Sequence, residues 1–243
     1  MKRILLVSDI HANLVALDTV LAKAAPFDRI WCLGDVVGYG PEPNACISRL
    51  RSFDLLCIAG NHDWAALGKL DLEESNPDAR RAAIWTREQL TVENLEWLGA
   101  LPDRVPTQAD HFTLVHGSPR YPIWEYVLTP AVARTNFEFF DTSICLMGHT
   151  HVPVIYRDHG WTATADPLIE NSPLALNPDR MMINPGSVGQ PRDGDSRAAY
   201  ALLDLDALTL THYRVEYDIA ATQAKMEQSN LPPRLITRLS YGW

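Results

Sequence analysis

The stretch Arg3-Ile4-Leu5-Leu6-Val7-Ser8-Asp9-Ile10-His11 joins a short apolar run to a carboxylate and an imidazole, and later parts of the chain repeat this combination. The apolar run ends at Ser8-Asp9 and predicts a buried β-strand over residues 3–8. It is too short for the apolar core of a signal peptide, which needs about 7–15 residues. The next segment, Asn13 to Ala24, carries its large apolar side chains on one stripe and predicts a helix.

Strands and helices continue to alternate through the first half of the chain. Apolar runs at 29–33 and 55–59 predict strands, and residues 42–51 predict a helix between them. Alternation of this kind indicates right-handed crossovers and parallel pairing. Further patterns predict helices at 76–90, at 92–98 after the cap residue Thr91, and from Thr129-Pro130 to about 140, with strands at 112–115 and 144–147.

The second half has a different character, because its strands follow one another without helices between them. Strands are predicted at 152–156, 181–184, 198–204 and 209–216, and we expect largely antiparallel pairing. The polar segment 157–180 predicts a loop or an irregular hairpin, and residues 218–228 and 232–239 predict closing helices. No repeat or linker divides the sequence, so we expect a single domain over residues 1–243.

The composition is that of a globular protein. Of 243 residues, 47% are apolar and 21% are charged, and no run approaches the roughly 20 apolar residues that a membrane span needs. The 21 basic and 30 acidic residues give a net charge of −9, which argues against a polymeric nucleic acid as partner. The cysteines are scattered and predict free thiols in a reducing, cytoplasmic setting: Cys32, Cys46, Cys57 and Cys145.

Five of the predicted strands are followed directly by side chains that can bind a metal ion. The motifs are Asp9-Ile10-His11, Gly34-Asp35, Gly60-Asn61-His62-Asp63, His116-Gly117 and Gly148-His149-Thr150-His151. Ligands gather at the carboxyl ends of strands in open α/β sheets, so we expect these motifs to meet at one crevice. Each motif alone is also common in turns and helix caps, but five in succession at strand ends are poorly explained by coincidence.

The residue types indicate the kind of site. Two carboxylates, four imidazoles and one amide suit divalent ions such as Mn²⁺, Fe²⁺ or Zn²⁺. The D-x-H and H-x-H spacings place alternate side chains on the same side of an extended segment. Seven ligands are too many for one tetrahedral ion, but they fit two ions that share a bridging carboxylate, an arrangement used to hydrolyse phosphate esters.

These motifs, extended by Gly34-Asp35-x-x-Gly38, resemble the signature of the calcineurin-like metallophosphoesterases over residues 8–151. The segment Asn184-Pro185-Gly186-Ser187-Val188 is similar to one in the short prokaryotic members of that family. The resemblance implies an α/β fold, a four-layer αββα sandwich of two mixed β-sheets flanked by helices. It also implies roles for the motif residues: Asp9, His11 and His151 on one ion, Asn61, His116 and His149 on the other, Asp35 as the bridge, His62 as the catalytic histidine and Asp63 as the group that orients its ring.

The same resemblance implies a mechanism and a class of substrate. A metal-bridging hydroxide would attack phosphorus, and His62 would protonate the departing alkoxide. We expect a phosphodiesterase that acts on small nucleotide-like esters. A phosphomonoesterase, including a protein phosphatase, and a dinucleoside polyphosphate hydrolase stay open as alternatives. A catalytically inactive scaffold of this fold would be expected to lack some of these ligands, and an amidohydrolase would be expected to use more carboxylates and a lysine.

Two further residues are candidates for contact with the substrate. Arg192 follows the Asn-Pro-Gly-Ser turn and can be placed near a second phosphate, although an ordinary surface arginine explains it as well. Tyr39 follows Gly38 and can be placed against a base, although a turn tyrosine is an equal explanation. The sequence leaves the oligomeric state open.

Overall fold

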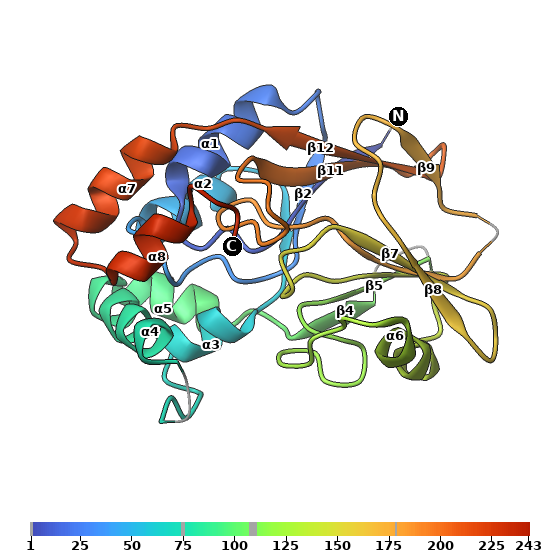
Figure 1. Ribbon diagram of the computed structural model, residues 1–243, viewed down its shortest axis with the longest axis horizontal. Helices are drawn as coiled ribbons and strands as arrows, with labels where there is room; N and C mark the ends of the chain where they lie inside the picture. The colour runs from blue at the N-terminus through green and yellow to red at the C-terminus, as the bar shows by residue number, and fades with distance from the viewer. Residues whose placement is uncertain (1, 74–75, 107–110, 178) are drawn as a thin grey trace.

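Two β-sheets lie face to face in the computed structural model, with helices outside them (Figure 1). The structure describes residues 2–73, 76–106, 111–177 and 179–243. In its described part, the first sheet has the order β3-β2-β1-β11-β12-β9. Its strands are β1 (Arg3–Val7), β2 (Arg29–Cys32), β3 (Leu55–Cys57), β9 (Pro173–Ala175), β11 (Ala198–Asp204) and β12 (Thr209–Val215). Strands β1, β2 and β3 pair in parallel, while β11 and β12 pair antiparallel.

The second sheet, within the same described residues, has the order β4-β5-β6-β10-β7-β8. Its strands are β4 (Arg104–Pro106), β5 (Phe112–Val115), β6 (Ile144–Leu146), β7 (Val154–Asp158), β8 (Ala163–Asp166) and β10 (Met181–Asn184). Strand β6 pairs in parallel with both β5 and β10, and β7 pairs antiparallel with β10 and β8. Both sheets are therefore mixed, as expected.

Most of the helices lie where the sequence predicts them, but α3, which begins at the Gly-Asn-His-Asp motif, was not predicted. The helices are α1 (Leu14–Lys23), α2 (Pro43–Arg51), α3 (Asn61–Ala66), α4 (Pro77–Gln89), α5 (Val92–Gly99), α6 (Pro130–Asn136), α7 (Ile219–Gln228) and α8 (Pro233–Arg238), with the short 3₁₀ helix η1 (Phe137–Phe139) after α6. The Thr129 side chain accepts a hydrogen bond from Val132 N, and Thr91 caps α5 in the same way. In the described part of the chain, no helix is long and apolar enough to cross a membrane.

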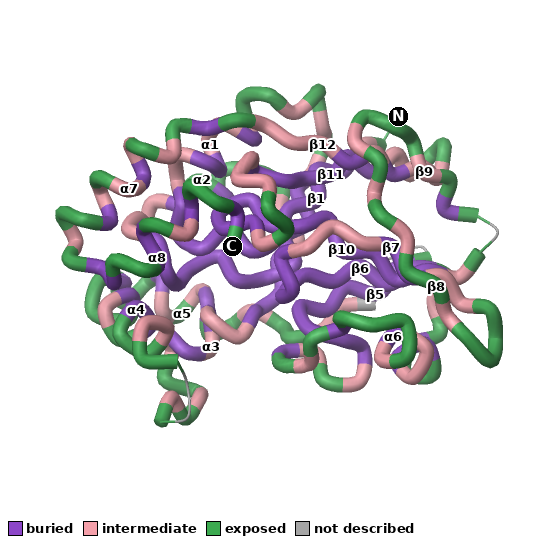
Figure 2. Tube along the Cα trace, viewed as in Figure 1, coloured by how far each residue is buried: buried purple, intermediate pink, exposed green. Residues whose placement is uncertain are grey.

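Alternate side chains of the strands enter different apolar layers. Leu5 and Val7 of β1 pack with α1 and α2, whereas Ile4 and Leu6 point the other way and pack against the second sheet. A third apolar cluster lies between the second sheet and α6. The buried residues accordingly run through the middle of the molecule and the exposed ones lie on the outer helices (Figure 2). The αββα architecture is confirmed.

Three short strands were not predicted. The segment 157–180, expected to be a loop or an irregular hairpin, contributes β8 to one sheet and β9 to the other. Strand β4 lies between the third and fourth strands that carry metal-binding motifs, so the five motif-bearing strands are not consecutive. They also belong to two sheets and not to one.

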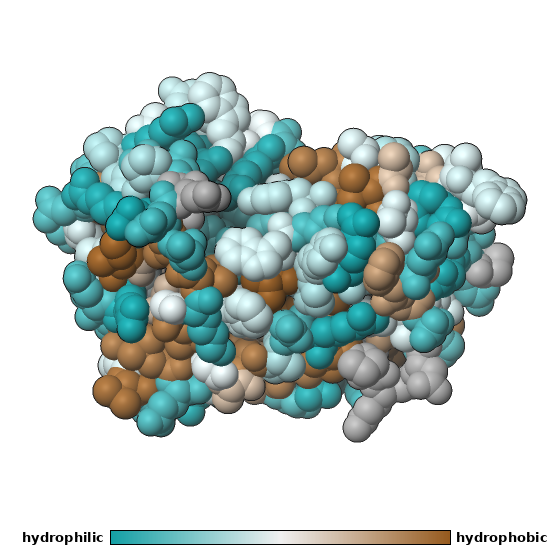
Figure 3. Space-filling model, turned by 90° about the horizontal axis from the view of Figure 1, so that it is seen from below, coloured by the Kyte–Doolittle hydropathy of each residue, from teal (hydrophilic) through white to brown (hydrophobic). Residues whose placement is uncertain are grey.

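The surface seen from below mixes hydrophilic and hydrophobic residues (Figure 3).

Candidate metal centre

The five sequence motifs converge where the carboxyl ends of strands from both sheets meet. Motifs after β1, β2 and β3 come from the first sheet, and those after β5 and β6 come from the second. Backbone hydrogen bonds join them: His11 N donates to Asp35 O at 2.9 Å and Gly148 N donates to His116 O at 2.9 Å. The backbone N–H of His149 also reaches Asp9 Oδ1 at 3.2 Å, which ties the two sheets together at the site.

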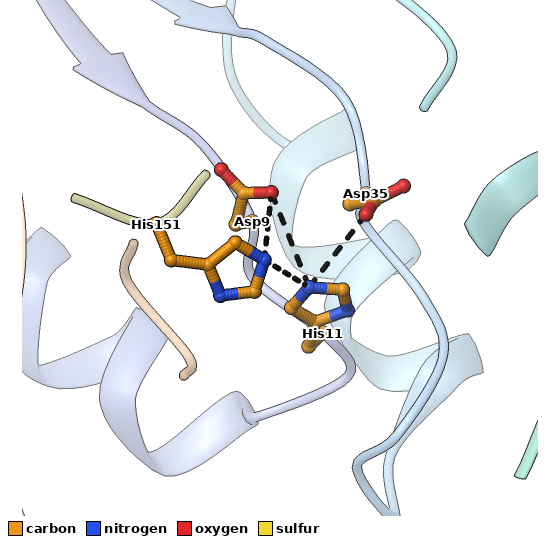
Figure 4. A group of neighbouring side chains, drawn as sticks. All are labelled: Asp9, His11, Asp35 and His151. Atoms are coloured by element: carbon orange, nitrogen blue, oxygen red, sulfur yellow. Dashed lines mark hydrogen bonds and ion pairs between the residues drawn. The ribbon is translucent and has the colours of Figure 1, made fainter. Parts of the chain in front are cut away.

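One group of candidate ligands consists of Asp9, His11, Asp35 and His151, all of them buried (Figure 4). One ligand atom from each side chain lies within 4.8 Å of the others. Asp9 Oδ1 is 3.2 Å from His151 Nε2, and Asp35 Oδ2 is 3.6 Å from His11 Nε2. These are the residues that the family resemblance assigns to the first ion and its bridge.

A second group of candidate ligands shares Asp35 with the first. Asp35, His116 and His149 offer ligand atoms within 4.8 Å of one another, and all three are buried. Asp35 Oδ2 is 3.3 Å from His116 Nε2, and Asn61 Oδ1 is 3.0 Å from the same nitrogen. The structure therefore brings all seven predicted ligands together, with Asp35 between the two groups.

The imidazole rings are oriented by backbone carbonyl groups. His116 Nδ1 donates to Leu33 O at 2.8 Å, His151 Nδ1 to Gln190 O at 2.6 Å and His11 Nδ1 to Val37 O at 3.3 Å. Each of these carbonyl groups holds an Nδ1–H, so that the Nε2 atom of the ring faces the site and is the atom that would bind an ion. For His149 the arrangement is reversed, since Nε2 bonds Trp124 O at 3.1 Å and leaves Nδ1 for a ligand.

This orientation of the rings fits a bound cation. His11 Nε2 and His151 Nε2 are only 3.1 Å apart, and with both protons on Nδ1 the two lone pairs face each other. Asp35 Oδ2 is buried and has no hydrogen-bond partner among the described residues. A buried polar atom without a partner is costly, and a divalent ion between these atoms would satisfy them all. The donor set therefore fits divalent ions.

Several candidate ligands adopt a backbone conformation that non-glycine residues rarely occupy. The φ angles are 53° at Asp9, 49° at His11, 52° at Asp35, 66° at His149 and 61° at His151. Each such residue costs on the order of 1–3 kcal/mol, so the surrounding structure must hold it in place. Strain of this kind gathers at functional sites, and here it coincides with the motif residues.

The segment that follows β10 supplies much of that support. Ser187 Oγ donates to Asp9 O at 2.8 Å, and Gly189 N donates to the same oxygen at 3.0 Å. Asn184 Nδ2 donates to Thr150 Oγ1 at 2.9 Å and also reaches Gly148 O. The Asn-Pro-Gly-Ser-Val segment noted in the sequence therefore fixes the loops that carry Asp9 and the Gly-His-Thr-His motif.

Burial and charge act together on the ionisable groups. Burial favours the neutral form of Asp35, but His116 and His62 outweigh it and hold the pKa of Asp35 well below its usual range. Burial likewise opposes the charged form of His116, but the Asp35 carboxylate raises the pKa of this imidazole to about 10. Burial lowers the pKa of His149 to about 3. The site thus concentrates negative charge on its carboxylates, where a cation would bind.

The predicted partnership of His62 and Asp63 is wrong. Asp63 Oδ1 accepts from Val37 N at 3.1 Å and Oδ2 accepts from Gly60 N at 2.9 Å, so this buried carboxylate fixes two loops. His62 Nδ1 has no hydrogen-bond partner among the described residues. Its ring is positioned by packing instead, with its centroid 4.1 Å from that of Tyr39. Because Asp63 follows His62 directly in the sequence, its side chain was expected to face the His62 ring, but it points toward the backbone of two loops instead.

Tyr39 and Arg192 both lie next to the candidate ligands. The Tyr39 ring centroid is 4.7 Å from that of His11, and the guanidinium of Arg192 is 5.8 Å from the centre of the Tyr39 ring. Arg192 N donates to His151 O at 3.4 Å, and its side chain donates to Gln190 Oε1 at 2.8 Å. Both residues therefore border the site, as their positions in the sequence suggest.

The structure adds residues that sequence reasoning missed. Tyr126 stacks on His149 with a centroid distance of 3.8 Å and an interplanar angle of 25°, although 46% of its surface is exposed. Ser8 Oγ donates to Asp9 Oδ2 at 2.6 Å. Ser8 directly precedes the Asp-x-His motif, so its position in the sequence could have indicated a contact with Asp9. Tyr126 lies in the loop between β5 and α6, outside the motifs, and nothing in the sequence indicated a role for it.

Comparisons with known proteins agree with this geometry. A family model for the calcineurin-like phosphoesterase superfamily domain matches residues 1–208. The crystal structure of a metallophosphoesterase from Sphaerobacter thermophilus is 48% identical with a TM-score of 0.91, and the alignment covers 100% of this chain and 99% of that chain. Uncharacterized protein MJ0912 of Methanocaldococcus jannaschii is 37% identical over 98% of each chain. The symmetrical bis(5'-nucleosyl)-tetraphosphatase of Glaesserella parasuis is 28% identical over 53% of this chain and 49% of that protein.

The chain belongs to the calcineurin-like phosphoesterase superfamily, since the family model and the full-length similarities agree with the αββα fold. It is a phosphoesterase that carries two neighbouring groups of Asp and His side chains able to hold metal ions.

Proposed function

We propose that the protein is a dinuclear-metal phosphodiesterase that hydrolyses small nucleotide-like phosphate esters. The observation that carries the proposal is the position of Asp35. Its Oδ2 atom is buried, has no hydrogen-bond partner among the described residues and faces His11 on one side and His116 on the other. A carboxylate in that position is suited to bridge two ions.

The ligand assignment follows the two groups of side chains. Asp9, His11 and His151 would hold one ion, and Asn61, His116 and His149 would hold the other. Asp35, which belongs to both groups, would contact both ions. When bound, Mn²⁺, Fe²⁺ or Zn²⁺ ions supply Lewis-acid charge for the phosphoryl oxygens and lower the pKa of water at the site.

His62 is proposed to give a proton to the departing alkoxide. It is the first-turn residue of α3, it is partly exposed, and its ring lies edge-on to that of His11 with a centroid distance of 5.0 Å. Its backbone N–H donates to Asp35 Oδ1 at 2.8 Å, which fixes α3 relative to the ligands. A Cβ at Gly38 would lie 2.9–3.1 Å from atoms of the His62 side chain, so a glycine there leaves space for the ring.

A second candidate function is hydrolysis of dinucleoside polyphosphates. It is favoured by the similarity to the tetraphosphatase of Glaesserella parasuis and by Arg192, a cation that borders the site and is suited to a second phosphate. Both candidates place the reaction in the same metal centre. The four cysteines are buried and free, which supports a reducing, cytoplasmic setting for either.

The test is hydrolysis by manganese-reconstituted protein of bis-p-nitrophenyl phosphate, p-nitrophenyl phosphate and a dinucleoside tetraphosphate. We expect the diester to be cleaved with a higher kcat/KM than the monoester. A metal-loaded protein without activity on any of the three substrates would contradict the proposal. A monoester preference would favour a phosphomonoesterase.

The role of His62 is tested separately with a series of diesters whose leaving groups differ in basicity. His62→Ala is expected to lose about 10²–10⁴-fold in rate with alkyl leaving groups and much less with p-nitrophenolate, which needs no proton. The matched control is His159→Ala, because this exposed histidine contacts Thr164 on the β7–β8 hairpin. An equal loss for all leaving groups would remove His62 from the acid role.

A further inference from the structure

A cavity of about 390 Å³ opens beside the candidate metal centre, between Tyr39, the Arg192 loop and the C-terminal segment. Its volume is in the range of sites that bind small molecules. Helix α8 forms one wall, because it packs with α4 and α7 around Tyr39 (Figure 1). The C-terminal segment therefore contributes directly to the surroundings of the metal centre.

Three arginines line this cavity: Arg192, Arg234 and Arg238. In the described part of the chain, none of them forms an ion pair with an Asp or Glu side chain. Arg192 donates to the amide oxygen of Gln190, and Arg238 Nε donates to the backbone oxygen of Trp243. Asp78 is the single acidic residue in the described lining, so the cavity is cationic.

Nearby carboxylates are already paired with other arginines. Asp193 follows Arg192 directly, but its carboxylate is paired with Arg214. Asp195 is paired with Arg197 at 2.7 Å. The carboxylates of Asp193 and Asp195 are thereby directed away from the cavity and do not pair with the arginines that line it. Burial, followed by the charges of Arg192 and Arg234, lowers the pKa of Arg238 to about 10.

The C-terminal wall is fixed against the Arg192 loop. Gly194 N donates to Gly242 O at 3.0 Å. Gly242 has a φ of 66°, and a Cβ there would lie 2.7 Å from the backbone carbon of Asp195. This close approach requires a glycine, and it sets the position of the arginines on α8 relative to Arg192.

The cavity also carries a flat aromatic surface. The rings of Tyr241 and Trp243 stack with a centroid distance of 4.9 Å and an interplanar angle of 25°. They are 52% and 64% exposed, so the outer face of the pair is open to solvent. Exposed aromatic rings beside arginines are suited to stacking on a nucleobase.

We propose that this cavity binds the part of the substrate beyond the scissile phosphate. Arg192, Arg234 and Arg238 bind a second phosphate, while Tyr241 and Trp243 stack on the base attached to it. The ligand class is a nucleotide with at least two linked phosphates. The inference rests on the proposed function, because it takes the scissile phosphate to lie at the metal centre, on the other side of Tyr39.

The binding test measures the dissociation constants of ADP, pyrophosphate and adenosine with metal-loaded protein by calorimetry. Arg234→Gln and Arg238→Gln are each expected to weaken ADP by about 10- to 100-fold, since a charge-assisted hydrogen bond is lost. The dissociation constant of adenosine, which has no phosphate, is expected to change little in these two variants. Trp243→Leu is expected to weaken ADP more than pyrophosphate.

The kinetic test compares the ratio of kcat/KM for a dinucleoside tetraphosphate to that for bis-p-nitrophenyl phosphate. Both arginine variants are expected to lower this ratio by about 10-fold or more. Arg134→Gln on α6 is the matched control, because this arginine pairs with Glu138 at 3.1 Å outside the cavity. Arg234 is exposed, so its variant tests the site even where Arg238→Gln disturbs the C-terminal turn.

The two proposals fail in different ways. Absence of hydrolysis of every ester by the wild-type protein contradicts the proposed function and leaves the ADP affinities to decide the role of the cavity. ADP affinity that is unchanged in both arginine variants overturns the inference, even where the wild-type protein cleaves diesters. The inference is also overturned if both the ADP affinity and the ratio of the two kcat/KM values are unchanged in these variants.

Discussion

Gly60 lies immediately before the ligand Asn61, and its replacement by alanine should damage the metal centre without unfolding the protein. A Cβ on this residue would lie 2.1 Å from Asp35 Oδ1 and 2.5 Å from Asp35 N. Backbone strain is not the issue, because the φ of Gly60 is −109°. The conflict is with the carboxylate that both groups of candidate ligands share.

The size of the effect follows from this overlap. Ordinary contact begins near 3.4 Å, so Asp35 Oδ1 must retreat by about 1.3 Å from the new methyl group. Overpacking of this kind costs about 1–3 kcal/mol of stability. Misplacement of a catalytic group by about 1 Å costs about 10²-fold in rate. Asp35 Oδ1 also accepts from His62 N, so α3 is displaced with the carboxylate.

The assay combines metal analysis, thermal unfolding and hydrolysis of bis-p-nitrophenyl phosphate. We expect Gly60→Ala to stay folded, to bind fewer than two ions and to lose about 10²-fold in kcat/KM. Gly99→Ala is the control, because no atom lies within 4 Å of a Cβ at this position in α5. A Gly60→Ala protein with two bound ions and wild-type activity would refute the bridging position of Asp35.

Three further perturbations test the surrounding structure. Burial, followed by the charge of Arg214, lowers the pKa of His212 to about 4. In the unfolded chain this imidazole has its ordinary pKa of about 6.5, so as the pH falls it is protonated in the unfolded state before the folded state, and the free energy of unfolding should fall by about 2 kcal/mol from pH 7 to pH 5. Denaturant titrations at both pH values should show a smaller fall in His212→Gln, and an equal fall would count against this explanation. Chelation of bound metal should lower the midpoint of thermal unfolding by about 5–10 °C for each ion that was at 100 times its dissociation constant, and scanning fluorimetry should show that added Mn²⁺ restores the midpoint; an unchanged midpoint would contradict the metal centre. Asn184→Ala removes two hydrogen bonds to the Gly-His-Thr-His loop and should lower the free energy of unfolding by about 1–3 kcal/mol. Calorimetry should also show weaker metal binding, because the loop shifts. Unchanged stability together with unchanged metal affinity would show that the loop does not depend on Asn184.

The candidate ligands could be read from the sequence because each follows an apolar strand. In a layered α/β fold, strand ends meet at one edge, so position after a strand is enough to bring Asp9, Asp35 and His116 together. The direction of a side chain after such a strand is harder to predict. Asp63 sits beside His62 in the chain but points to the backbone of Val37 and Gly60, because the first turn of α3 aims its carboxylate at those N–H groups.

Elements that depend on distant partners were beyond the sequence. Strands β4 and β9 have three residues each, too few to show a period of two, and they exist because β5 and β12 offer them an edge. The contribution of α8 to the site was hidden for a related reason. Nothing near Arg234 in the sequence indicates that this helix packs beside Tyr39.

The net charge of −9 is compatible with binding of phosphate, because of how the positive charges are paired. Arg197 and Arg214 are paired with carboxylates close to the cavity, so that each of these charges is largely neutralised by its partner. Among the described residues, the guanidinium groups that line the cavity are not paired with Asp or Glu side chains. A protein with an excess of acids can therefore keep a small cationic site, provided that its acids are paired elsewhere. Broad basic surfaces of the kind that bind polymeric nucleic acid are not needed for a substrate that carries two or more phosphates on a small molecule.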